Sequence, residues 1–208
     1  MKKQILALAL LAVSYTTLAQ TETKQSKLSL IVEAKLGFAR ISQEGSVKLN
    51  GSINGSDLLL SYKFAKNWDV ATGIGMMEFD ANSILAGNAT SLKNTYIQIP
   101  VLINGNYVIF KNKETQNPNV AFIVSVGLCA NTLLKQEIET ISGSASSKNL
   151  GWNYSFLSQF GVKFIISDEL NLGLGLEGQT DFTKMKNNGT EQRIEQLNAL
   201  FFKLGFNF

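Results

Sequence analysis

The sequence predicts an all-β protein, an eight-stranded antiparallel transmembrane β-barrel. Three observations predict this fold. Apolar and polar residues alternate with a period of two, the alternating segments are even in number, and long polar segments alternate with short turns between them. The composition agrees, because 208 residues include 17 Gly and 13 Phe but only 2 Pro, which favours strands and tight turns over helices or disorder.

The first segment is typical of a secretory signal peptide. Two lysines precede the apolar run 5–13, and small residues follow it. A membrane anchor is the less favoured alternative, because this run is shorter than the ~20 residues that a spanning helix needs. We therefore expect a cleaved signal peptide over 1–19, a periplasmic N-terminal tail over 20–27, and an outer-membrane barrel over 28–208.

The first strand shows the pattern that defines the others. Leu36 and Phe38 share one face of the segment, whereas Glu33 and Lys35 share the other, and a helix would mix these two classes. The same sorting predicts strands over 28–38, 57–64, 68–76, 94–107, 120–134, 152–164, 170–181 and 202–208.

The connections between these strands alternate in length. The longer ones, rich in Gly, Asn and Ser, are 42–56, 80–92, 135–150 and 183–195. The short turns are 65–67 and 166–169, and only 109–118 breaks the alternation. This asymmetry is typical of outer-membrane barrels, and in the mature chain no apolar run reaches the length of a spanning helix. We expect any partner proteins of the cell envelope to contact the long segments.

The content of the two faces indicates which one meets lipid. The polar face is rich in small residues and charges, which suits a narrow barrel interior, whereas the other face carries large aliphatic and aromatic side chains. We expect outer-membrane lipid to contact the apolar face, with two aromatic girdles formed by Tyr62, Trp68 and Phe164 near short turns and by Phe38, Trp152 and Phe182 near long segments. A soluble periplasmic barrel with its apolar face inward, binding an apolar ligand, is the alternative.

The inward face carries five acids and four bases, which nearly cancel. An unpaired ion in a poorly hydrated lumen costs several kcal/mol, so we expect a mutually paired network. Its members are Glu33, Lys35, Asp57, Lys63, Asp69, Lys163, Glu177, Asp181 and Lys203. Because side chains fill the interior of an eight-stranded barrel, this favours a plugged interior over a small-solute channel, which stays as an alternative.

The residue content argues against an enzyme. The chain has no His and a single Cys, and it lacks a Gly-x-x-x-x-Gly-Lys-Ser/Thr phosphate loop. We expect no catalytic residue, no cofactor and no metal site. Cys129 is expected to be a small apolar side chain that fills space, and the carboxylates of Glu33, Asp57 and Glu177 are expected to pair with the interior bases. Nineteen Lys and Arg against 16 Asp and Glu exclude a strongly basic nucleic-acid binder.

Segment 94–103, NTYIQIPVLI, resembles the Tyr-x-Glu/Gln-Ile-Pro-x-Leu strand of the PorT-type outer-membrane β-barrel proteins. Gln98 stands where that family often has Glu, which removes one interior charge. The resemblance implies a Gram-negative outer membrane, both termini in the periplasm and a link to protein secretion, but no single activity. Pro100 cannot donate a ladder hydrogen bond, so we expect a local bulge there, with a hinge as the alternative.

The last strand ends in two alternating aromatic residues. Phe206 and Phe208 resemble the signal by which the outer-membrane assembly machinery recognises its clients, and a strand that is merely hydrophobic is the alternative. The sequence as a whole predicts a structural or interaction component of the cell envelope.

Overall fold

The computed structural model describes residues 27–43, 48–85, 88–111, 118–141, 143–148, 151–187 and 190–208. The expected signal peptide and most of the expected tail lie outside these residues. The strands are β1 (Leu28–Gln43), β2 (Leu49–Ala65), β3 (Trp68–Leu85), β4 (Asn88–Lys111), β5 (Pro118–Thr140), β6 (Gly143–Lys148), β7 (Trp152–Ile165), β8 (Leu170–Asp181), β9 (Met185–Asn187) and β10 (Thr190–Asn207). Within the described ranges, no helix has the length and apolar character needed to cross a membrane.

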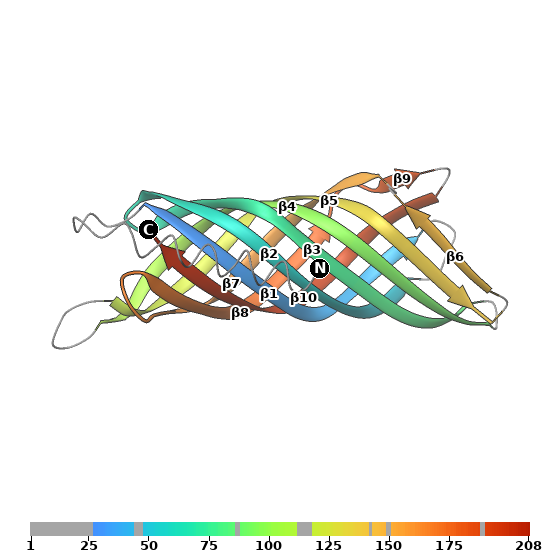
Figure 1. Ribbon diagram of the computed structural model, residues 1–208, viewed down its shortest axis with the longest axis horizontal. Coiled ribbons are helices and arrows are strands. Elements are labelled where there is room, and N and C mark those ends of the chain that lie inside the picture. Colours follow the sequence, from blue (N-terminus) through green and yellow to red (C-terminus); the bar gives the residue numbers. More distant parts are fainter. Residues whose placement is uncertain are drawn as a thin grey trace.

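Eight long strands form a closed antiparallel barrel (Figure 1). Their order is β1, β2, β3, β4, β5, β7, β8 and β10, and β10 pairs back onto β1 from Ser29 opposite Asn207 to Gln43 opposite Gln192. The short strands β6 and β9 are not among these eight, because they pair only beside the ends of β5 and β10. The predicted eight-stranded antiparallel barrel is therefore confirmed.

The two ends of the barrel differ. At one end, called here the termini end, the backbone N–H of Phe208 donates to the carbonyl of Leu28 at 3.0 Å, and the short turns close β2 to β3 and β7 to β8. The other end, called here the hairpin end, carries β6 and β9, and its strand pairs extend well beyond the rest of the barrel (Figure 1).

The long polar segments are not the loops that the sequence predicted. Most of their residues belong to paired strands, because β3 runs to Leu85, β5 runs to Thr140 and β2 begins at Leu49. Their Gly, Asn and Ser content gave the appearance of loops. Alternation nevertheless continues through them, as the inward-facing Leu49 and Ile53 on β2 show.

Near the termini end, apolar side chains point outward and charged ones point inward. Val32 and Leu36 are 40% and 60% exposed, whereas Glu33 and Lys35 are 0% and 1% exposed. A soluble barrel with an apolar interior would require the opposite arrangement. This half of the molecule therefore presents its apolar surface to its surroundings, as a barrel in lipid must.

Toward the hairpin end the polarity of the two faces reverses. On β3 the outward residues change from Met76 to Glu78 and Asp80, while Met77 and Phe79 are fully buried inside. Polar side chains outside and apolar ones inside are the arrangement of a barrel surrounded by water. The strands are thus long enough to leave the apolar band and continue as a water-exposed extension.

Pro100 does not create a bulge, so that expectation is wrong. The register with β5 is continuous across the pair Pro100 and Cys129. Pairing with β3 is instead interrupted between Thr72 and Gly75 without a register shift, and the Thr72 hydroxyl donates to the Pro100 carbonyl at 2.8 Å. The missing proline N–H is therefore accommodated by a gap in the β3–β4 ladder.

Candidate functional site

The middle of the barrel interior holds a buried lysine between two carboxylates. Lys35 Nζ lies 2.8 Å from Asp57 Oδ2 and 3.0 Å from Glu177 Oε1. The three side chains come from β1, β2 and β8, and all are buried. Gly75 makes room for this arrangement, because a Cβ atom there would overlap Asp57 Oδ1.

A second ion pair joins this one through a glutamine. Lys203 Nζ lies 3.1 Å from Glu33 Oε2 and donates to Gln159 Oε1 at 2.6 Å. The amide nitrogen of Gln159 donates to Glu33 at 2.9 Å and to Glu177 at 2.6 Å. Five residues of the expected charge network thus lie together, and Gln159, which the sequence analysis did not single out, connects them.

The other four expected members lie apart from this group. The carboxylate of Asp69 accepts from Ser61, Asn104 and Asn106. Asp181 accepts from Asn153, Ser155 and the backbone N–H of Ile194. Lys163 donates to Asn106. Among the described residues, the Lys63 side chain has no ion pair. Asp69, Asp181 and Lys163 are therefore stabilised mostly by amide and hydroxyl groups, not by opposite charges.

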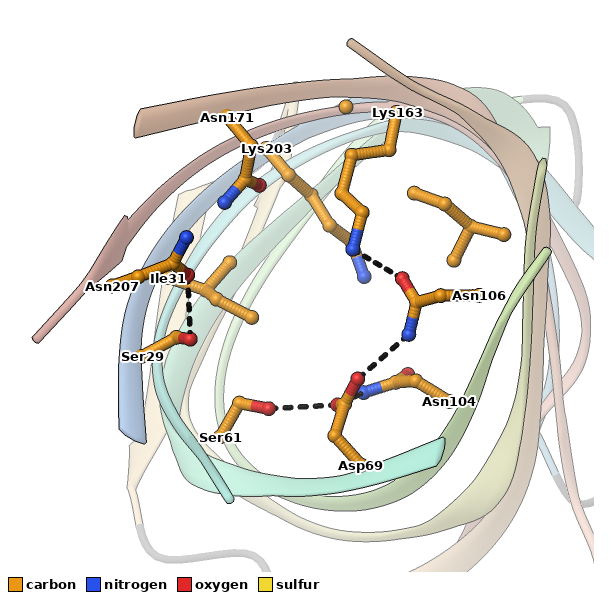
Figure 2. A pocket seen from close by; sticks show the side chains of 12 residues that line it. Ser29, Ile31, Ser61, Asp69, Asn104, Asn106, Lys163, Asn171, Lys203 and Asn207 are labelled. Atoms are coloured by element: carbon orange, nitrogen blue, oxygen red, sulfur yellow. Dashed lines mark hydrogen bonds between the residues drawn. The ribbon is translucent and has the colours of Figure 1, made fainter. Parts of the chain in front are cut away.

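A small polar pocket lies inside the termini end, and Figure 2 shows Asp69 and Lys163 on opposite sides of Asn106 there. Its cavity volume is about 60 Å³, enough for a few water molecules. Lys203 also borders the pocket and links it to the buried ion pairs. Room for water therefore reaches Lys203, whereas Lys35, Asp57 and Glu177 are buried and do not line the pocket.

Beyond the ion pairs, a layer of amide side chains crosses the interior. Gln98 donates to Asn131 at 3.0 Å and to Gln179 at 3.3 Å, and Gln179 donates to Ser155 at 2.9 Å. Cys129 is buried beside this layer, with its Sγ atom 3.2 Å from the Asn131 oxygen. An uncharged Gln98 fits here, because its amide donates to oxygens that would repel a carboxylate.

An apolar cluster fills the interior of the hairpin half. Its buried members are Ala39, Ile41, Leu49, Ile53, Met77, Phe79, Ala81, Leu92, Tyr96, Leu133, Met185, Ile194, Leu197 and Ala199. Six of them fall in the segments interpreted as loops, which is why the sequence analysis missed the cluster. The signal was present in the alternation of Leu49, Gly51 and Ile53, whose apolar residues face inward.

The geometry favours binding of the interior groups to one another over catalysis. The carboxylates of Glu33, Asp57 and Glu177 lie against lysine or amide nitrogens and are buried. The described residues contain no group of three or more His, Cys, Asp or Glu side chains placed to hold a metal ion. The interior carboxylates of the ion-pair group are therefore paired within the barrel.

The family model for the outer membrane protein beta-barrel domain matches residues 5–208. The chain belongs to this family. A barrel of this family lies in the outer membrane, which accounts for the outward apolar band near the termini end. The comparison with curated proteins gave no match.

The chain is also similar to several solved structures, at low sequence identity. Neisserial surface protein A is 12% identical, with a TM-score of 0.49, over 86% of this chain and 97% of that one. The attachment invasion locus protein Ail of Yersinia pestis is 14% identical, with a TM-score of 0.45, over 88% and 99%. The N-terminal barrel domain of OprF from Pseudomonas aeruginosa is 11% identical, with a TM-score of 0.44, over 86% and 97%.

The six expected girdle residues of this outer membrane barrel all point outward. Near the termini end, Trp68 opens β3, and Tyr62 and Phe164 lie close to the ends of β2 and β7. Toward the hairpin end, Phe182 stacks on Tyr154 with ring centroids 6.4 Å apart. Phe38 and Trp152 are also exposed at that level. The C-terminal Phe206 and Phe208 lie on the outer face of the closing strand pair or just beyond it.

Proposed function

We propose that this outer membrane barrel has a plugged interior and acts as a structural or interaction component of the cell envelope, not as a pore or an enzyme. The observation that carries the proposal is the buried Lys35 inside the lumen, where it is held between Asp57 on β2 and Glu177 on β8. Paired charges that occupy the lumen oppose ion flow, and the apolar cluster beyond them excludes water.

Planar-bilayer recording tests the plugged interior. Purified barrel, verified as folded by its heat-modifiable migration on a denaturing gel, is added to a bilayer, with an open porin recorded in parallel as a positive control. We expect no stable conductance step. A reproducible open state would favour the small-solute channel and overturn the proposal.

A finer proposal is that the protein takes part in protein secretion. It rests on the resemblance of segment 94–103 to PorT-type proteins. In the present barrel, Tyr96 and Gln98 of this segment face the interior, and Pro100 interrupts the ladder to β3. Deleting the gene and quantifying the secreted proteins tests it. An unchanged set of secreted proteins in the deletion strain would refute the link.

The maturation and orientation of the chain are proposals as well. We propose cleavage after Ala19, assembly through the C-terminal aromatics Phe206 and Phe208, and both termini in the periplasm. The intact mass of the purified barrel gives the cleavage site. An Asp substitution of Phe208 should reduce the amount recovered in outer membranes, and protease added to whole cells should spare a tag at the C-terminus.

A further inference from the structure

Two outward-facing cations lie just beyond exposed aromatic residues of the lipid-facing band. Arg40 follows Phe38 by two residues on β1, and Lys184 follows Phe182 by two residues after β8. All four side chains are exposed. Two residues of extended strand span about 7 Å, so Arg40 lies at the level where lipid headgroups meet a barrel whose aromatics mark the interface. Lys184 lies close to the same level, because it is two residues from Phe182.

The same side of the hairpin half gathers more positive charge. On β1, β2, β9, β10, the residue before β2 and the β8–β9 connection, the described charged residues of the outer face are the cations Arg40, Lys48, Lys184, Lys186 and Arg193 and the acids Glu191 and Glu195. Five cations against two carboxylates leave an excess of three positive charges. We call these five cations the basic face.

Each carboxylate within the basic face is shared by two cations. Glu191 lies 2.5 Å from Lys184 Nζ and 2.7 Å from Lys186 Nζ. Glu195 lies 2.8 Å from Lys48 Nζ and 3.6 Å from Arg193 Nη2. Hydrogen bonds from the two lysines lower the pKa of Glu191 to about 2, so it is ionised at neutral pH. The acids hold the cations in place but neutralise only part of their charge.

The opposite side of the hairpin half lacks this excess. On β3 to β6, the described outward cations are Lys93, Lys135 and Lys148, and the acids are Glu78, Asp80, Glu137 and Glu139. That side has one more acid than base. The positive charge is therefore local to the basic face and is not a general property of the barrel rim.

Arg40 has the geometry to bind a phosphate. Its Nε atom donates to Asn50 Oδ1 at 3.0 Å, which orients the guanidinium group. None of the described residues accepts a hydrogen bond from its terminal nitrogens. A guanidinium fork matches two phosphate oxygens, and an oriented one loses less conformational entropy on binding.

Apolar residues on the termini-end side of the cations favour binding of a lipid over binding of a free anion. Leu36 on β1 and Leu200 on β10 are directly opposite each other, and both point outward toward the termini-end side of Arg40. A headgroup at Arg40 would place its acyl chains along these leucines and Phe38. A dissolved phosphate would gain nothing from this surface.

We propose that the basic face binds an anionic lipid whose headgroup carries a phosphate monoester, in the membrane leaflet that surrounds the hairpin end. The guanidinium and ammonium groups bind the phosphate, and Leu36, Phe38 and Leu200 contact the acyl chains. The site lies outside the barrel and does not depend on whether the interior conducts.

Quenching of Trp152 by brominated lipid tests this site. Trp152 lies next to the basic face, because the preceding residue, Gly151, packs against Lys186: a Cβ added at Gly151 would lie 3.2 Å from the Lys186 carbonyl oxygen. A Trp68→Phe background leaves Trp152 as the single tryptophan. The barrel is reconstituted in phosphatidylcholine vesicles containing brominated phosphatidic acid or brominated phosphatidylcholine. We expect about tenfold preference for phosphatidic acid, on the scale of about 1 kcal/mol per basic residue near a charged headgroup.

Two charge-matched triple variants identify the residues responsible. Arg40→Gln, Lys184→Gln and Arg193→Gln together should reduce the preference to less than about twofold. The control Lys93→Gln, Lys135→Gln and Lys148→Gln, on the opposite side, should keep the wild-type value. An equal loss in both variants, or no preference in the wild type, overturns the proposal.

Two further arms keep the test decisive. Excess inorganic phosphate at matched ionic strength should leave the preference in place, and abolition of the preference would mean that the surface binds free phosphate and not lipid. If the first triple variant shows no heat-modifiable band, Arg40→Gln alone carries the test, with an expected fall of about threefold. An unchanged preference in that folded single variant would refute the role of Arg40.

Discussion

At the scale of single residues, the charged interior depends most on Lys35. Its ammonium is the direct partner of two buried carboxylates, Asp57 and Glu177. Removing it would leave both in a low-dielectric interior without a counter-charge. Breaking a buried ion pair by deleting one partner is far more costly than never forming it, because the remaining charge has no water to solvate it.

We therefore expect Lys35→Ala to destabilise the barrel by about 3–5 kcal/mol. The measurement is the thermal unfolding midpoint in detergent. Lys63→Ala is the matched control, because this inward lysine has no ion pair among the described residues, and it should shift the midpoint little. An unchanged midpoint for Lys35→Ala would show that the carboxylates are stabilised in another way.

Tyr96 belongs to the apolar cluster but also accepts hydrogen bonds there. Its phenolic oxygen accepts from Asn94 at 2.9 Å and from Gln192 at 2.6 Å. Tyr96→Phe leaves two buried amide N–H groups unpaired, so we expect a loss of about 1–3 kcal/mol in the free energy of unfolding. Tyr62→Phe, on the outward face, should have almost no effect. Equal effects of the two substitutions would contradict this role.

Alternation alone predicts which residues face inward, but not which of them meet. Glu33, Lys35 and Lys203 could be placed inside from the period of two. The partnership of Lys35 with Glu177, 142 positions away, depends on the stagger of eight strands around the barrel. Gln159 was not singled out because it is neutral, and Tyr96 was noted only as part of the motif in segment 94–103. The hydrogen bonds of both residues nevertheless connect much of the interior.

At the scale of elements, β6 of the β5–β6 hairpin is held by a single neighbouring strand. Every residue of β6 is exposed, and among the described strands it pairs with β5 alone. The sequence predicted a loop here because Ser and Gly dominate the segment. Such residues also tolerate a strand whose two faces both meet water, so composition does not separate the two structures.

Shortening this hairpin should leave the barrel intact. Gln136 and Ser147 are directly opposite each other, so residues 137–146 can be replaced by an Asn-Gly turn. We expect heat-modifiable migration to persist and the unfolding midpoint to fall only slightly. Ile138→Ser is the control, because Ile138 is the one described side chain of residues 137–146 that packs on the apolar cluster. Failure of the shortened chain to fold would mean that the hairpin is needed for assembly.

At the scale of the whole molecule, the closure of β1 onto β10 turns a sheet into a barrel. Ser29 and Asn207 face each other across this seam, with their side chains 2.8 Å apart. The order of strands followed from the sequence, since neighbours in the chain pair, but the seam depends on residues 178 positions apart. Its register could not be read from local patterns.

A disulfide across the seam tests this closure. In a Cys129→Ser background, Ser29→Cys with Asn207→Cys should form a disulfide in the folded barrel, detected as a loss of two free thiols. Ser29→Cys with Phe206→Cys is the control, because position 206 lies on the opposite face of the strand. Free thiols in the first pair of the folded protein would show that the seam has a different register.

The reversal of polarity along the strands also bears on how such barrels diversify. The residues that face lipid lie on the outer surface, whereas the apolar cluster of the hairpin half lies at inward residues such as Phe79 and Leu197. Small or polar residues at these inward positions would leave the lipid-facing surface unchanged. Under the plugged-interior proposal, such substitutions change the permeability of the barrel without changing its residence in the membrane.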